Sequence, residues 1–173
     1  MTMVLTSNSI DLSEIVLRLG LATAAGMILG LNRWMHHKAA GVRTHSLVSI
    51  GAALVVLLVG GLSGADAQDV SRVLQGLITG IGFLGAGVII REDHSNSVHG
   101  LTTAASLWAC AILGATYGSG QYVLATCAMA AMLLVLIFGG PLERAASKWK
   151  GDSRNSEKEE KTEAQISNKD HTL

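Results

Sequence analysis

The chain has 173 residues, of which 49% are hydrophobic and only 15% charged, and its formal net charge is zero. Ordinary soluble domains carry about 25% charged residues, and the absence of net basicity gives no support to nucleic acid as a partner. Because the charges are also separated from long apolar runs, the composition predicts an integral membrane protein in one compact domain with a polar tail.

The first predicted helix follows a polar N-terminal stretch, residues 1–11, and runs from Leu12 to about Leu31. Asp11 to Glu14 has the spacing of a capping box, in which two side chains bond free backbone N–H groups at a helix start. A basic connector rich in histidine, Asn32 to Gly41 (NRWMHHKAAG), comes next. A second apolar run from Arg43 to about Leu62 predicts the second helix.

A glycine-rich run, Gln75 to Ile90 (QGLITGIGFLGAGVII), follows a small acidic loop, Ser63 to Asp69. Its charge-free part from Val73 to Ile90 spans roughly 27 Å as a helix, close to the hydrocarbon thickness of a bilayer. Lipid offers the backbone no competing hydrogen-bond partner, so glycine is tolerated there. We interpret the run as a central helix that neighbours approach from more than one side, packing on Gly76, Gly80, Gly82, Gly85 and Gly87.

If this interpretation holds, Gly80→Leu is more damaging than Leu77→Ala, because the leucine side chain would force a helix pair apart. The same glycines, Gly80, Gly82 and Gly85, also spell the G-x-G-x-x-G of a dinucleotide-binding loop. That motif needs a preceding strand and an acidic residue about twenty positions later. Gly100 and Leu101 stand where the acid should be, so the nucleotide interpretation is rejected.

The remaining chain predicts a polar loop, Glu92 to His99, then spans Leu101 to Tyr117 and Tyr122 to Phe138, the last ended by Gly139, Gly140 and Pro141. The expected fold class is an all-α polytopic membrane helix bundle of about five transmembrane helices with a glycine-rich central helix. Its transmembrane domain covers residues 12–141, and a charged, largely disordered tail covers residues 142–173. A weakly polar stripe on the fourth span is expected to pack on the central helix: Thr103, Ser106, Cys110, Gly114 and Tyr117.

Basic residues near helix ends predict the orientation, since they collect on the cytoplasmic side of membranes. Five spans with the N-terminus outside place Arg72, with Arg18 as a second candidate, on the outside and leave the tail cytoplasmic. The same arrangement places most of the cations inside: Arg33, Lys38, Arg43, Arg91, Arg144, Lys148 and Lys150.

Three stretches together resemble the MgtC/SapB family of bacterial inner-membrane proteins: Ala40 to Leu54 (AGVRTHSLVSIGAAL), Gly76 to Glu92 (GLITGIGFLGAGVIIRE) and Val98 to Ala111 (VHGLTTAASLWACA). The resemblance implies a multi-pass protein linked to growth at low magnesium and to survival inside macrophages. It also implies a regulatory mode of action, with ATP synthase as one proposed partner. Many relatives have Glu-Arg where this chain has Asn32 and Arg33, and longer members add a cytoplasmic domain, so the chain is placed with short SapB-like members.

Polar residues at the predicted cytoplasmic ends of the spans form the candidate functional cluster: Asn32, Arg33, Arg43, Thr44, His45, Arg91, Thr102 and Thr103. Arg43 opens the second span, where free backbone N–H groups favour an anion. It would therefore hold an acidic partner or a lipid phosphate, or alternatively mark the membrane edge as a snorkelling side chain. Both interpretations remain open from the sequence.

The sequence predicts no metal site, no cofactor and no enzyme activity. Five histidines are expected at the cytoplasmic face (His36, His37, His45, His94 and His99), but none has the companions of a zinc site. Cys110 and Cys127 are interpreted as small buried apolar residues. No nucleophile is paired with a base.

Magnesium or small-ion transport is the alternative to regulation. Mg²⁺ prefers carboxylate ligands, whereas we expect none in the apolar spans, because Asp66, Asp69, Glu92 and Asp93 are assigned to loops. The partners considered are the lipid bilayer, a homo-oligomer and another inner-membrane complex.

Overall fold

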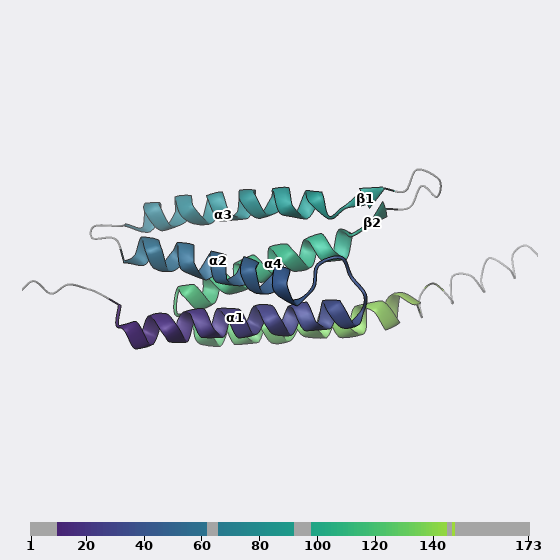
Figure 1. Ribbon diagram of the computed structural model, residues 1–173, viewed down its shortest axis with the longest axis horizontal. Helices are drawn as coiled ribbons and strands as arrows, with labels where there is room; N and C mark the ends of the chain where they lie inside the picture. The colour runs from purple at the N-terminus through teal and green to yellow at the C-terminus, as the bar shows by residue number, and fades with distance from the viewer. Residues whose placement is uncertain (1–9, 62–65, 92–97, 145–146, 148–173) are drawn as a thin grey trace, which may run out of the picture. The chain divides into compact units, whose positions relative to one another are not determined.

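The computed structural model of the chain describes residues 10–61, 66–91, 98–144 and 147, with the backbone alone described for residues 90 and 91 (Figure 1). The predicted polar N-terminus up to residue 9 and the predicted tail beyond residue 147 lie outside the described residues. So do residues 63–65 of the predicted loop Ser63 to Asp69 and residues 92–97 of the predicted loop Glu92 to His99.

Five helices account for most of the described chain, which confirms the all-α bundle. They are α1 Leu12–Met35, α2 Val42–Gly60, α3 Ala67–Gly87, α4 Leu101–Gly118 and a fifth helix, Tyr122–Arg144. Successive helices run in opposite directions through the first four (Figure 1). The described residues also contain a short antiparallel pair of strands, β1 Ile90–Arg91 and β2 Val98–His99, between α3 and α4.

Four of these helices are long and apolar enough to cross a membrane: α1, α2, α3 and the fifth helix. The fourth predicted span, α4, is 18 residues long and mixes Thr, Ser and Gly with its apolar residues. It is also the helix with the most buried residues, ten in all. Its crossing of the membrane therefore stays a prediction, whereas the four longer helices show a multi-pass architecture.

The capping box predicted from Asp11 to Glu14 does not form at the start of α1. The Asp11 side chain makes no cap hydrogen bond to the backbone of α1 and instead accepts from the Ser13 hydroxyl at 2.6 Å. Glu14, the other member of the predicted box, accepts a hydrogen bond from Arg18. A capping box forms at α3, where Asp66 accepts from the backbone N–H of Asp69 and the Asp69 carboxylate accepts from that of Asp66.

The fifth helix continues to Arg144, so the predicted stop at Gly139 to Pro141 is wrong. In a membrane, helix-breaking residues are tolerated, because no water competes for the backbone groups that they release. The chain divides into two compact units, Met1–Leu133 and Leu134–Leu173, and this helix runs from the first into the second. Helices α1 to α4 all belong to the first unit.

Helix α2 lies between α1 and α4 at distances that only glycine permits. A Cβ atom added at Gly26 or Gly30 of α1 would lie 2.7 Å from the Cα of Ser46 or 2.6 Å from that of Val42. On the other side, a Cβ at Gly118 of α4 would lie 2.7 Å from the Ala53 carbonyl oxygen, and one at Gly114 would clash with the backbone of Ser49. Two pairs of small residues spaced by four, Gly26 with Gly30 and Gly114 with Gly118, therefore let α1 and α4 approach α2 more closely than a side chain would allow.

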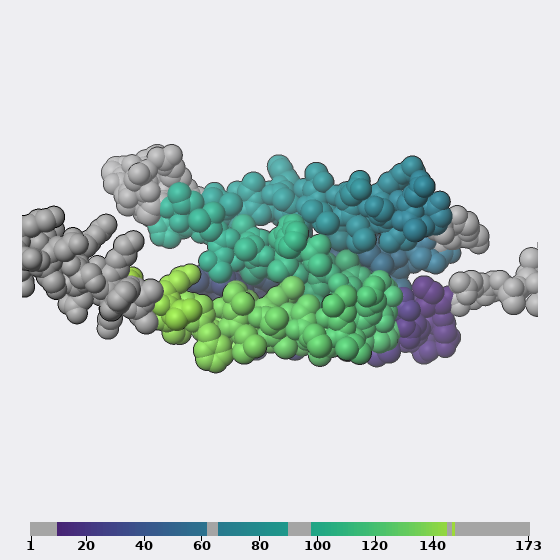
Figure 2. Space-filling model, turned by 180° about the vertical axis from the view of Figure 1, so that it is seen from behind, coloured from purple at the N-terminus to yellow at the C-terminus, as the bar shows by residue number. Residues whose placement is uncertain are grey.

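Helix α3 is third in chain order but lies at the edge of this group, with α2 and α4 between it and α1 (Figures 1 and 2). Ile81 packs with Ala52, Ala111 and Ala115, and a Cβ added at Gly85 would lie 3.6 Å from the Cβ of Ala104. A Cβ at Gly76, Gly80, Gly82 or Gly87 would meet nothing within 4 Å. The prediction that neighbours approach this helix from more than one side is thus wrong within the described chain, because α2 and α4 both lie on one side of it.

Candidate functional site

A polar cluster lies inside the contact between α1, α2 and α4, and we name it the Arg33–His45 cluster after its two largest members. It comprises Arg33, His45, Thr103 and Ser106, all of them buried. Arg33 is in the last turn of α1 and is only 4% exposed. Its Nη2 donates to the Thr103 hydroxyl at 3.0 Å, while its Nε has no hydrogen-bond partner among the described residues.

His45 is completely buried, and its ring connects the start of α2 to α4. Its Nδ1 lies 3.0 Å from the Gly41 carbonyl oxygen, which can only accept, so Nδ1 carries a proton. Its Nε2 lies 3.1 Å from the Ser106 hydroxyl, which also lies 2.8 Å from the Thr103 carbonyl. Ser106 has one proton for these two positions, so it donates to Nε2 of a neutral His45 or to Thr103 when His45 carries both protons.

The polar stripe predicted on α4 is buried along its whole length, but it packs on α2 and, through Thr103, on α1 rather than on the glycine-rich helix. Cys110 Sγ donates to the His45 carbonyl at 3.2 Å, and Gly114 meets the backbone of Ser49. Ser49 in turn donates to the Ala22 carbonyl at 2.7 Å, which joins α2 to α1. Of the two cysteines predicted to be buried, Cys110 is buried and Cys127 is exposed.

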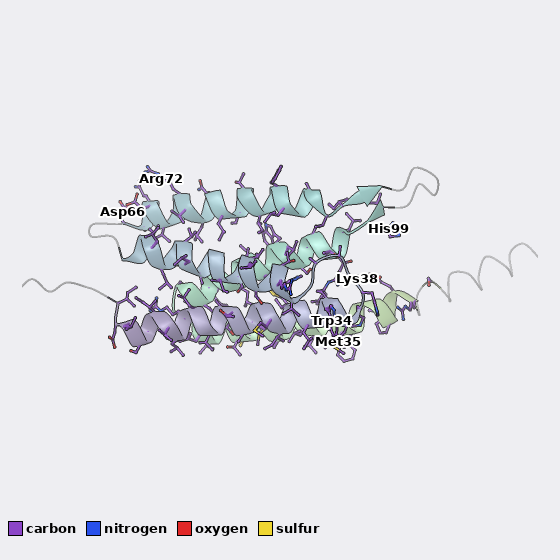
Figure 3. The ribbon with its side chains drawn as sticks, in the orientation of Figure 1. Trp34, Met35, Lys38, Asp66, Arg72 and His99 are labelled. Atoms are coloured by element: carbon purple, nitrogen blue, oxygen red, sulfur yellow. The ribbon has the colours of Figure 1, made fainter. Side chains whose placement is uncertain are left out.

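Arg43 and Thr44 lie apart from the cluster, exposed at the start of α2. They border a surface hollow of about 560 Å³ together with Leu31, Trp34, Gly41 and Val42. Figure 3 shows Trp34, Met35, Lys38 and His99 toward one end of the first unit, and Asp66 and Arg72 toward the other. The connector between α1 and α2 therefore lies at the same end as the β1–β2 strands.

The structure brings together three of the eight residues predicted for the site, Arg33, His45 and Thr103. Asn32 is partly buried and Thr102 is exposed, and the side chain of Arg91 lies outside the described part of the chain. Ser106, predicted only as a packing residue, is the missing member of the cluster. Within the described residues, no group of three or more His, Cys, Asp or Glu side chains could hold a metal ion; His94 is not among these residues.

A second polar cluster joins the start of α1 to the turn after α4. Glu14 accepts from Arg18 Nε at 2.8 Å and from the Tyr122 hydroxyl, and Arg18 Nη1 donates to the Gly118 carbonyl at 3.0 Å. The premise that the spans hold no carboxylate is therefore wrong: Glu14 belongs to α1 and Asp69 to α3. Glu14 and Tyr122 are far apart in the sequence, so the helical spacing of residues around either one does not predict that they meet.

These features define a polytopic all-α membrane protein whose interior contains a buried cation and a buried histidine. A profile of the MgtC family matches residues 19–145. The chain therefore belongs to the MgtC family, as its motifs predicted.

Individual relatives agree with this assignment. SrpB of Synechococcus elongatus is 40% identical over 139 residues, which are 75% of this chain and 76% of SrpB. YhiD of Escherichia coli K12, whose name proposes a magnesium transporter, is 39% identical over 72% of this chain and 60% of its own length. MgtC of Brucella abortus strain 2308 is 42% identical over 55% of this chain and 38% of its own. No solved structure matches the chain.

Proposed function

We propose that this chain is a non-enzymatic membrane protein that regulates another complex of the bacterial inner membrane during adaptation to low magnesium. Membership of the MgtC family and the names of its relatives support a membrane protein of magnesium homeostasis. The end that carries Lys38 and Arg43 is cytoplasmic in this proposal, because basic residues near helix ends are retained there.

The buried guanidinium of Arg33 carries the argument for regulation over transport. It lies between α1 and α4, buried and bonded to the neutral hydroxyl of Thr103. A fixed positive charge repels Mg²⁺, which prefers carboxylate oxygens. The carboxylate of Glu14 is held by Arg18 and Tyr122 in the other cluster, so it does not offset this charge.

The hollow beside Arg43 supplies the surface that we propose for partner contact. Within the described part of the chain, the N-cap residue Gly41 offers no side chain to cap the first backbone N–H groups of α2, which favour an anion, and Arg43 is exposed next to them. The exposed indole of Trp34 adds an amphipathic contact group at the same border. An acidic segment of a larger membrane complex fits this chemistry, and ATP synthase is the first candidate to test.

The test combines flux with partner capture. The purified full-length chain is reconstituted in liposomes that contain a Mg²⁺-sensitive dye, and its insertion and folding are verified. In parallel, the tagged chain is isolated from membranes of magnesium-limited cells, as parent, as Arg43→Ala and as Lys38→Ala. Lys38 is an exposed cation at the same end but outside the hollow, so it controls for loss of charge alone.

We expect no Mg²⁺ entry above that of empty liposomes, and we expect capture of a membrane complex that Arg43→Ala weakens about tenfold while Lys38→Ala leaves it within about twofold. Saturable Mg²⁺ entry through the parent protein would overturn the regulatory proposal in favour of transport. Equal capture by parent and Arg43→Ala would refute the hollow as the contact surface.

A further inference from the structure

Arg33 is a buried cation without a counter-ion in the described part of the chain. It is 4% exposed, and neither of the ion pairs found among the described residues, Arg18–Glu14 and Arg72–Asp69, includes it. Its buried Nε bonds to none of the described residues. A buried charge is costly unless it is paired and its hydrogen bonds are made. An anion beside the guanidinium would supply both.

The donors that Arg33 leaves unused suit an anion with two oxygens. Nη2 donates to the Thr103 hydroxyl at 3.0 Å, but it carries two hydrogens, so this bond uses only one of them. On a guanidinium, Nε–H and an N–H of the neighbouring Nη form a planar fork that matches two oxygens of a phosphate or a carboxylate. Arg33 therefore retains the donors for an oxyanion after its bond to Thr103 is counted.

The start of α4 adds a second group that favours an anion at the same place. Thr103 lies in the first turn of α4, where the first backbone N–H groups lack partners within the helix and carry the positive end of its dipole. The N-cap residue Gly100 makes no side-chain cap bond. A Cβ atom there would clash with the Val88 carbonyl oxygen, so no capping side chain fits. The buried guanidinium and this uncapped helix start meet at Thr103.

The depth of this place in a membrane favours phosphate over other oxyanions. Helix α1 has 24 residues and is therefore about 36 Å long, against about 30 Å for the hydrocarbon core of a bilayer. Arg33 precedes the end of α1 at Met35 by about 3 Å along the axis, which is the boundary of a core on which α1 is centred. Figure 3 shows Met35 and His99, just before α4, toward the same end. Lipid phosphates lie immediately outside this boundary, within reach of an arginine side chain.

We propose that Arg33 and the first turn of α4 bind a phosphate group, which comes either from the headgroup of an anionic lipid or from a soluble phosphate. The oxygens accept from the guanidinium fork and from the free N–H groups of the helix start. A phosphodiester carries one negative charge, which balances that of Arg33 and leaves no net negative charge to attract Mg²⁺. The site is separate from the hollow beside Arg43, so it does not depend on the proposed partner contact.

Two probes distinguish the sources of the phosphate. The purified full-length chain is kept in a maltoside detergent, which contains no phosphate. It is titrated with phosphatidylglycerol, with phosphatidylcholine of the same acyl chains as the control without net charge, and separately with inorganic phosphate. Native mass spectrometry counts the bound lipids, and equilibrium dialysis measures the bound phosphate. Neither measurement needs a partner complex, so its result is independent of the regulatory function.

Three variants locate the binding. Arg33→Lys keeps the charge but removes the fork, Thr103→Val keeps the side-chain shape but removes the hydroxyl that orients Arg33, and Lys38→Gln removes an exposed cation at the same end. We expect the parent to bind one phosphatidylglycerol at least about fivefold more tightly than phosphatidylcholine, or to bind one inorganic phosphate. For the probe that binds, we expect Arg33→Lys to weaken binding about tenfold, Thr103→Val about threefold, and Lys38→Gln less than about twofold.

The pattern of loss decides the proposal. Selective binding of phosphatidylglycerol that Arg33→Lys weakens assigns the site to a lipid headgroup, and the same result with inorganic phosphate assigns it to a soluble phosphate. A folded parent that binds neither probe selectively would overturn the proposal, and so would equal binding by the parent and a folded Arg33→Lys. If Arg33→Lys does not fold by circular dichroism, Thr103→Val decides, and binding unchanged in that variant would refute the site.

Discussion

The two glycine-rich regions of this protein have the same local pattern and opposite environments. Gly26, Gly30, Gly114 and Gly118 lie where α1 and α4 press against α2, and a Cβ atom at any of them would clash with backbone. For Gly76, Gly80, Gly82 and Gly87 of α3, no atom of the described residues lies within 4 Å of the same position. A pair of small residues spaced by four therefore indicates that a helix can be approached closely, but the neighbouring helices decide whether it is.

The two regions also differ in where their polar side chains lie and in what those side chains can bond. In the α1–α2–α4 group, polar side chains are enclosed and bonded across helices, as His45 is to Ser106. On α3 they are exposed along the outer face, as Gln75 is. Enclosed polar groups hold the monomer together, whereas exposed polar groups at membrane depth are available to another molecule.

The largest expected effect is that of Gly114→Ala, which places a methyl group against the backbone of Ser49. Backbone cannot rotate away as a side chain can, so the helices must separate, and we expect a loss of about 3 kcal/mol in the free energy of unfolding. Denaturation in detergent, followed by tryptophan fluorescence, measures it. Gly76→Ala on α3 is the control and should stay within about 0.5 kcal/mol of the parent.

Gly30→Ala and Gly80→Ala form a matched pair, because each glycine ends a small-residue pair with spacing four. We expect Gly30→Ala to cost about 2 kcal/mol, since its Cβ would lie 2.6 Å from the Cα of Val42, and Gly80→Ala to cost less than about 0.5 kcal/mol. The same denaturation assay compares them. Equal losses would show that the outer face of α3 is as closely packed as the α1–α2 contact.

Ser106→Ala tests the enclosed polar groups. It removes the hydroxyl beside His45 Nε2, which leaves a buried ring nitrogen without a partner, and we expect a loss of about 1.5 kcal/mol. Thr79→Ala on α3 removes an exposed hydroxyl bonded only to its own helix and should cost less than about 0.5 kcal/mol. Unfolding midpoints of the two variants, each read at low protein concentration, decide the comparison. A loss at Thr79 that matches the loss at Ser106 would contradict it.

The smallest expected effect reverses the expectation drawn from the sequence for Gly80 and Leu77. Leu77 packs partly against the cluster of Ala52, Ile81, Ala111 and Ala115, so Leu77→Ala should cost about 1 kcal/mol. Gly80→Leu adds a side chain that points into open space and should cost less than about 0.5 kcal/mol. Thermal unfolding of both proteins in the same detergent measures the order. The original expectation would be restored if Gly80→Leu were the less stable variant.

The sequence determined the helices, the class of protein and the family. A long apolar segment must satisfy its backbone within itself in lipid, so each spanning helix follows from local composition. Motifs from three stretches identified the MgtC family, and the family profile confirmed it. The polar cluster was predicted in part, because its members cluster at the ends of apolar runs.

The tertiary structure alone decided which of these features meet. Arg33 and Thr103 are 70 positions apart, and Glu14 and Tyr122 are 108 apart, so no local periodicity specifies either contact. The position of the glycine-rich helix at the edge of the group, and the burial of Ser106 against His45, depend in the same way on which helix faces which. A helix forms from bonds within four residues along the chain, but its partners are chosen by the sum of weak contacts with every other helix.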